Sequence, residues 1–100
     1  MANQLTIEMF TDLIDKEFIV DVDDSHSVGM ELIEIYDMSE APGHKTAART
    51  HFSLVFRGPD EPIYPENTYR FEHEELGTLD ILITPAGPDT DGMRYEAVFE

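Results

Sequence analysis

The chain of 100 residues contains no cysteine and no tryptophan, and lysine and arginine together number only 6. Without cysteine the chain can form no disulfide, no thiolate zinc site and no cysteine nucleophile. The absence fits a reducing compartment, and we expect a cytoplasmic protein. The first residues carry neither a basic region nor an apolar run long enough for a signal peptide or a spanning helix, so we expect no contact with a membrane.

Positive charge is scarce because 22 acidic residues outnumber the basic ones, which gives a formal net charge of -16. Such a surface repels phosphates, and the few cations are scattered along the chain, so nucleic acid is excluded as an expected partner. The charge has two interpretations that the sequence leaves open. It either keeps a small domain soluble or attracts a protein partner with a basic surface, in which case association would be sensitive to salt.

The strongest pattern of apolar residues lies in the stretch 51–59. Phe52, Leu54 and Phe56 alternate there with more polar residues, which is the period of a half-buried strand. Weaker alternation recurs in residues 17–22, 28–36, 67–72, 77–84 and 94–99. The links between these runs are short, so the sequence predicts a mainly β fold in one domain, 1–100. We expect an antiparallel, curled sheet that forms a small barrel or sandwich of about six strands.

One short helix is predicted over residues 5–14, where Ile7, Phe10 and Ile14 are close to helical spacing. Thr6 is the expected N-cap, and Leu5 is expected to pack on Phe10 as a hydrophobic staple. A helix of two or three turns is not stable alone, so its apolar side must dock on the sheet as a lid.

Two irregularities are predicted within the strands. The adjacent apolar residues Leu32 and Ile33 shift the alternation, which indicates a β-bulge, although periodicity alone leaves a short helix open. Pro85 is expected to end the strand that precedes it, because proline has no N–H to donate to a sheet.

Two connections supply candidate interaction residues. Residues 37–50 form the longest segment without an apolar pattern, and they contain His44, Lys45 and Arg49; a loop of this length is either functional or simply disordered, and we favour disorder. Between the prolines of the 58–66 connection lie Ile63 and Tyr64. These two side chains either pin the connection to the core or form an exposed apolar tip for a partner.

The stretch from Asp89 to Gly92 resembles the middle of a calcium-binding loop, since Asp89 and Asp91 could both face one hard cation. The distal glutamate of such a loop is missing, and an ordinary hairpin turn uses the same residue types. We therefore favour a turn and keep Asp89 and Asp91 as a weak metal candidate. The acidic residues 21, 23 and 24 are open to the same two interpretations.

The four histidines do not form a zinc-binding helix motif, and the sequence has neither a nucleophile elbow nor a glycine-rich phosphate loop. We therefore expect no cofactor and assign no catalytic residue. His73 lies among glutamates that could orient its imidazole, although a turn histidine beside acids is commonly just solvated. A small enzyme or a calcium- or zinc-dependent binding protein that uses His51, His73 and nearby carboxylates is the alternative function.

The stretches FSLVFRGP, YRFEHEELGTLDILITPAGPD and GMRYEAVFE resemble a family of short uncharacterised bacterial domains of unknown function. FIVDV and MELIEI resemble it more loosely. The resemblance implies a stand-alone protein without a catalytic residue set, sometimes encoded near phage-tail-collar-like proteins. It also implies that a set of glycines and prolines shapes the turns: Gly58, Pro59, Gly77, Pro85 and Gly92.

Together, the missing catalytic motifs, the curled sheet and the resemblance predict a non-catalytic module that binds another protein. An accessory or assembly role, in a phage-tail-like or surface assembly, is the more specific form of this hypothesis.

Overall fold

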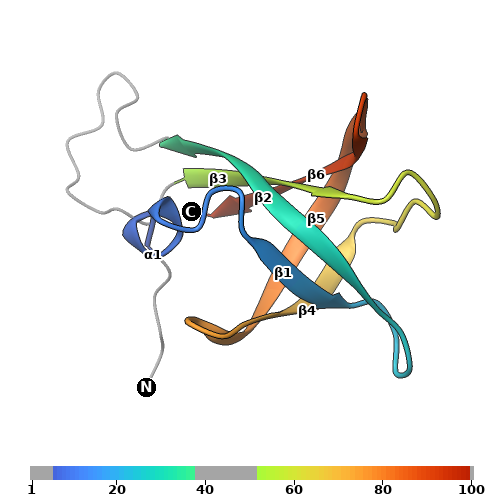
Figure 1. Ribbon diagram of the computed structural model, residues 1–100, viewed down its shortest axis with the longest axis horizontal. Helices are drawn as coiled ribbons and strands as arrows, with labels where there is room; N and C mark the ends of the chain where they lie inside the picture. The colour runs from blue at the N-terminus through green and yellow to red at the C-terminus, as the bar shows by residue number, and fades with distance from the viewer. Residues whose placement is uncertain (1–5, 38–51, 100) are drawn as a thin grey trace.

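The computed structural model describes residues 6–37 and 52–99, in which one short helix precedes six strands (Figure 1). The helix is α1 (Glu8–Thr11). The strands are β1 (Glu17–Asp21), β2 (Ser27–Asp37), β3 (Phe52–Gly58), β4 (Asn67–His73), β5 (Gly77–Asp89) and β6 (Gly92–Phe99). All neighbouring strands are antiparallel, and the order β1-β2-β3-β6-β5-β4 closes into a barrel because β1 also pairs with β4. The predicted mainly β fold is confirmed, as the barrel rather than the sandwich.

The interior of the barrel is filled by the alternating side chains of the strands. Phe52, Leu54 and Phe56 of β3 are fully buried, as their spacing predicts. Ser53 and Val55 on the other face of β3 are also buried, with only 3% and 7% of their surface exposed. The expectation of a half-buried strand is therefore wrong for β3. This strand lies between β2 and β6, so side chains of both neighbours flank its outer face.

Helix α1 closes one end of the barrel. Phe10 is fully buried, and its ring centroid lies 5.9 Å from that of Phe52 and 6.2 Å from that of Phe99. Ile7 and Leu13 are buried beside it, so the predicted lid is confirmed. The predicted length of two or three turns is wrong, because α1 has only 4 residues.

The cap predicted at Thr6 is also wrong. Ile7 occupies the N-cap position of α1, and no side chain caps the helix. The chain leaves the helix early because it must join β2 before it enters β1. Asp15, whose φ is 71°, donates its N–H to the carbonyl oxygen of Leu32, and Leu32 donates to the carbonyl oxygen of Lys16. Leu5, the other half of the predicted staple, lies outside the described residues.

Two strands contain a shift of register. The shift in β2 falls between Leu32 and Glu34, where the bulge is predicted. The shift in β5 falls between Pro85 and Gly87, and the strand continues to Asp89, so the prediction that Pro85 ends it is wrong. Pairing with β4 reaches only Ile83, so from there on β5 has one neighbour. A proline is tolerated because no second ladder needs its N–H.

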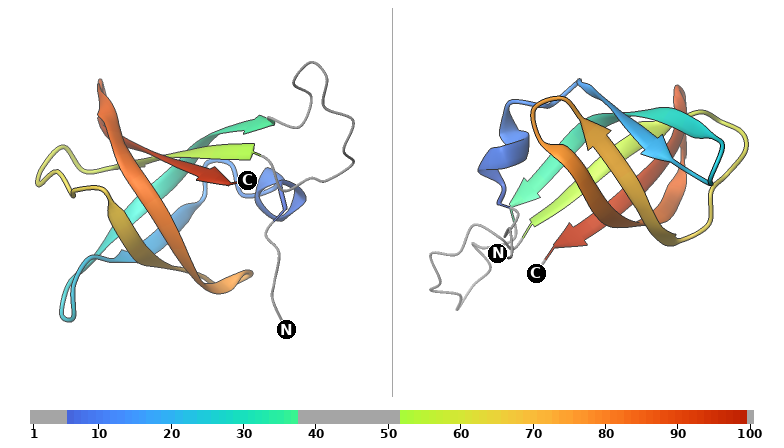
Figure 2. Two further views of the ribbon diagram at one scale, coloured as in Figure 1. Left: turned by 180° about the vertical axis from the view of Figure 1, so that it is seen from behind. Right: turned by 90° about the horizontal axis from the view of Figure 1, so that it is seen from below.

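Antiparallel order places the connections at two opposite ends of the barrel (Figures 1 and 2). The helix end carries α1 and the β4–β5 turn, residues 74–76. The loop end carries the β1–β2, β3–β4 and β5–β6 connections, residues 22–26, 59–66 and 90–91. Within the described part of the chain, no helix is long and apolar enough to cross a membrane.

Candidate functional site

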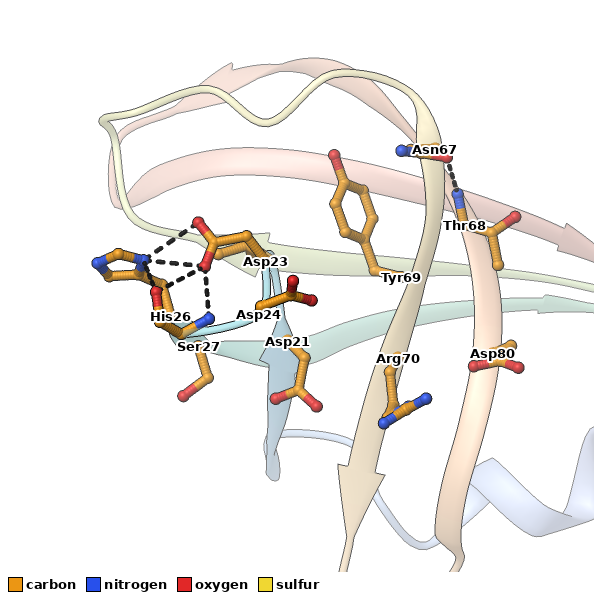
Figure 3. Close-up of a pocket in the computed structure, with 12 residues that line it drawn as sticks. Asp21, Asp23, Asp24, His26, Ser27, Asn67, Thr68, Tyr69, Arg70 and Asp80 are labelled. Carbon is orange, nitrogen blue, oxygen red and sulfur yellow. Dashed lines mark hydrogen bonds and ion pairs between the residues drawn. The ribbon is translucent and has the colours of Figure 1, made fainter.

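The loop end is the part of the described structure where candidate residues converge. A hollow of about 560 Å³ opens on its side, between the β1–β2 turn and the start of β4 (Figure 3). Four aspartates, one arginine and one histidine are among the residues that line it: Asp21, Asp23, Asp24, Asp80, Arg70 and His26. The balance of charge in the hollow is therefore negative.

The floor of this hollow is a row of side chains that crosses four strands. The register places Ser27 opposite Asp21, Asp21 opposite Arg70, and Arg70 opposite Asp80. Figure 3 shows Asp21, Arg70 and Asp80 in this order along the row. Among the residues described, Arg70 makes no ion pair with either facing aspartate, since no dashed line joins them in Figure 3.

The β1–β2 turn orders the acidic rim of the hollow. The carboxylate of Asp23 accepts a hydrogen bond of 2.8 Å from the N–H of Ser25 and shares one of 2.9 Å with Nδ1 of His26. The Ser25 N–H, and then the His26 contact, lower the pKa of Asp23 from its ordinary value of 3.8. Asp23 is therefore a turn residue that stays ionised, in agreement with the turn interpretation.

The β3–β4 connection is attached to the barrel by two tyrosine hydroxyls. Tyr95 accepts a hydrogen bond of 2.9 Å from the main-chain N–H of Tyr64, and Tyr69 donates one of 2.6 Å to the carbonyl oxygen of Pro65. Burial raises the pKa of both Tyr69 and Tyr95 above 10.0. These hydroxyls therefore remain protonated and hold the connection in place.

Ile63 and Tyr64 play different parts in this connection. Tyr64 is half-buried and packs against the core, whereas Ile63 is 58% exposed. Tyr64 therefore pins the connection to the core, whereas Ile63 is exposed, and its role toward a partner stays a prediction. The same connection carries three exposed acidic residues, Asp60, Glu61 and Glu66.

The Asp89 turn is occupied by partners from the protein itself. Arg57 donates to Asp89 from Nε at 3.0 Å and from Nη2 at 2.8 Å. The same carboxylate accepts bonds from the N–H groups of Asp91 and Gly92, at 2.8 Å and 2.9 Å. The Arg57 guanidinium, followed by the Asp91 N–H, lowers the pKa of Asp89 from 3.8. This is the geometry of a turn locked by an ion pair.

A metal centre finds no geometric support in the described residues. They contain no group of three or more histidine, cysteine, aspartate or glutamate side chains placed to hold an ion. Asp91 lies at the edge of the Arg57 pair, with its carboxylate 4.0 Å from Nη2 of Arg57. We therefore do not propose a metal site at Asp89 and Asp91.

His73 and the Asp89 turn lie at opposite ends of the barrel. His73 faces Gly77 at the start of β5, and Asp89 is the last residue of that strand. The extended chain between them spans on the order of 40 Å. The ring of His73 lies against that of Phe18, with centroids 4.8 Å apart, and its Nδ1 accepts a hydrogen bond from the N–H of Glu75. His73 therefore acts as a turn residue at the helix end.

The remaining sequence candidates lie outside the described residues. They are His44, Lys45, Arg49 and His51. Conversely, the sequence analysis missed the Arg57–Asp89 pair and the Tyr64–Tyr95 hydrogen bond. Their partners are 32 and 31 residues apart, and nothing in the local pattern of either stretch indicates the other.

The fold and its loop end thus define a small, six-stranded antiparallel barrel with an acidic, ordered set of loops. Residues 5–99 match a family described as a domain of unknown function, DUF6916, and the chain belongs to this family. No curated protein and no solved structure matches the chain. The predicted resemblance to a short domain of unknown function is confirmed.

Proposed function

We propose that this protein is a non-catalytic binding module that docks a basic protein partner at its loop end, with Ile63 as the apolar anchor. The observation that carries this proposal is the position of Ile63. It is largely exposed on a connection that two buried tyrosine hydroxyls hold in place.

The attachment matters because binding costs less when the contacting segment is already ordered. A mobile loop loses conformational freedom when it docks, whereas a connection fixed at Tyr64 and Pro65 has already lost it on folding. Exposed apolar side chains on fixed segments are the kind that fill pockets on a partner. Ile63 is thus held in a fixed position on the surface before a partner binds.

The surrounding charge indicates the chemistry of the partner. Asp60, Glu61 and Glu66 are exposed around Ile63, and the net charge of the whole chain is -16. An apolar centre within a polar rim is the usual anatomy of an interface. Lysine or arginine side chains around an apolar pocket complement this rim, and the long-range field steers such a partner to it.

The more specific form of the proposal is an accessory role in an assembly. The resemblance to domains encoded near phage-tail-collar-like proteins supports a structural protein of such an assembly as the partner. A catalytic or metal-dependent function is not proposed, because His73 and the Asp89 turn lie at opposite ends of the barrel.

The proposal is tested by capturing partners on the immobilised protein and on two variants. Ile63→Ser removes the anchor, and Leu82→Ser removes a side chain of similar exposure, 53%, from the wall of β5. We expect a protein with a basic surface to be retained by the wild type and by Leu82→Ser but lost by Ile63→Ser. Its affinity, measured by calorimetry with the purified pair, should fall as salt is raised.

Two outcomes would refute the proposal. One is equal retention of the captured protein by Ile63→Ser and the wild type. The other is an affinity for the purified partner that does not change between low and high salt.

A further inference from the structure

Strand β5 changes its neighbour halfway along its length. Residues 77–83 pair with β4, whereas the pairing with β6 begins at Thr84 and Glu96 and runs on to Asp89 and Gly92. Among the described strands, none pairs with the side of residues 77–83 that faces away from β4. It is also the longest run of described strand residues with one side unpaired. We call it the open edge.

The open edge lacks the feature that protects the rest of β5. Over residues 84–89, where β5 pairs only with β6, the strand contains Pro85 and Pro88, which have no N–H to donate. Proline is one of the devices by which proteins prevent a strand edge from pairing with another chain. Residues 77–83 contain no proline. Alternate residues of this run direct their N–H and C=O groups away from β4, where an added strand could bind them.

The inward face of the barrel is less well covered along the open edge. Ile83 and Ile81 are buried, with 0% and 1% of their surface exposed, whereas Leu79 is only half-buried. On β6, Ala97 is buried, and Phe99, which lies beyond the last pair with β5, is half-buried. An extended segment beside the open edge would therefore cover apolar surface as well as bind main-chain groups.

The charge of the open edge indicates which kind of segment fits it. Asp80 is exposed in the middle of the run, and Glu74 and Glu75 are exposed in the turn before it. Residues 74–83 contain no lysine or arginine, and Arg70 faces Asp80 from the other side, on β4. Opposite charges on neighbouring strands stabilise a sheet, and like charges destabilise it. A second copy of this chain would bring its own acidic run to the edge, so a basic segment is the better occupant.

We propose that the open edge binds an extended, basic segment of a partner protein, which adds a strand to the barrel beside β5. The main chain of the segment pairs with residues 77–83, its apolar side chains face inward beside Leu79, and its lysine or arginine side chains face outward beside Asp80. The open edge does not include Ile63, so this proposal holds or fails independently of the docking proposed at the loop end.

An NMR titration of the intact protein with a synthetic peptide tests this proposal. The peptide has about nine residues, in which lysine and valine alternate. We expect saturable shifts of the amide signals of residues 77–83, while those of residues 62–64 stay in place. The same peptide with its main chain N-methylated keeps the side chains and the charges but has no N–H to donate, and it should not bind. Ile63→Ser should bind the unmodified peptide as the wild type does.

Asp80→Asn should weaken the binding of the peptide several-fold, because it removes the charge beside which the lysines lie. Asp60→Asn is the matched control: it removes the same charge from an exposed position of the β3–β4 connection and should bind as tightly as the wild type. Equal binding of the N-methylated peptide would overturn the proposal, since charge alone would then explain the attraction. The absence of saturable shifts at residues 77–83 would overturn it as well, and so would an equal loss of affinity in the two variants.

Discussion

The main-chain N–H of Tyr64 donates a hydrogen bond of 2.9 Å to the hydroxyl of Tyr95, a fully buried residue of β6. This contact ties the exposed β3–β4 connection to the interior of the barrel. Together with the hydrogen bond from the hydroxyl of Tyr69 to the carbonyl oxygen of Pro65, it orders the surface segment that carries the proposed anchor, Ile63.

We expect Tyr95→Phe to destabilise the protein although it keeps the aromatic ring. The N–H of Tyr64 would lose its partner in a half-buried place, which costs about 1 to 3 kcal/mol. The free energy of unfolding in urea measures this loss. Tyr36→Phe is the control, because the hydroxyl of Tyr36 is exposed and donates only to Glu34 on the same strand. A loss of equal size in both variants would contradict the assigned role of Tyr95.

Phe10 should be the most important residue of the helix end. Phe10→Ala would open a cavity among Phe18, Phe52 and Phe99, and such truncations cost about 3 to 5 kcal/mol. The free energy of unfolding of a small domain is only about 5 to 15 kcal/mol, so the variant would be marginally folded. Thermal unfolding measures the effect, and Asp12→Ala, an exposed position after the helix, is the control. A stable Phe10→Ala protein would show that α1 is not a lid.

The Arg57–Asp89 pair should contribute to stability only above the acid range. The pKa of Asp89 is lowered from 3.8 in the folded protein, so the stabilisation is full above 3.8 and disappears as pH falls through the folded value. At neutral pH, Asp89→Asn should therefore lower the urea midpoint. In strong acid the variant and the wild type should unfold alike. Asp91→Asn, whose carboxylate is mostly exposed, should differ little from the wild type at either pH. A difference for Asp89→Asn that persists in strong acid would contradict this origin of the effect.

Calcium should leave the β5–β6 turn unchanged. The carboxylate of Asp89 is already occupied by Arg57 and by two backbone N–H groups, so a cation would have to displace all three contacts. We expect the amide signals of residues 89–92 to stay in place in an NMR titration with calcium chloride. Localised shifts that saturate at these residues would restore the calcium interpretation of Asp89 and Asp91.

Much of the barrel could be predicted because strands record their inward face locally. Phe52, Leu54 and Phe56 mark the inward face of β3 within one short stretch. The bulge near Leu32 is also marked locally, because two apolar residues are adjacent there. The end of β5 could not be predicted in the same way. A proline disrupts a strand only where a neighbouring strand lies on the side to which the missing N–H would point, and whether β5 has a neighbour on each side at Pro85 is a property of the sheet.

For the candidate site, the sequence marked Ile63 and Tyr64 as special but left their roles open. Tyr95, whose hydroxyl decides between those roles, lies 31 residues further along the chain. The role of Asp89 also depends on a distant residue, because Arg57, which binds its carboxylate, lies 32 residues earlier in the chain. Local residue types were enough to indicate a turn there, but not to show what holds it.

By itself, the sequence determined which residues face the core, where the acidic charge is high, and that no cysteine chemistry is available. These are properties of single residues and of neighbours two positions apart. The tertiary structure alone decided which strand closes on which, why both faces of β3 are buried, and that His73 and Asp89 stay at opposite ends. The physical reason is that these features depend on pairings between distant segments, and a side chain carries no local mark of the strand that it will meet.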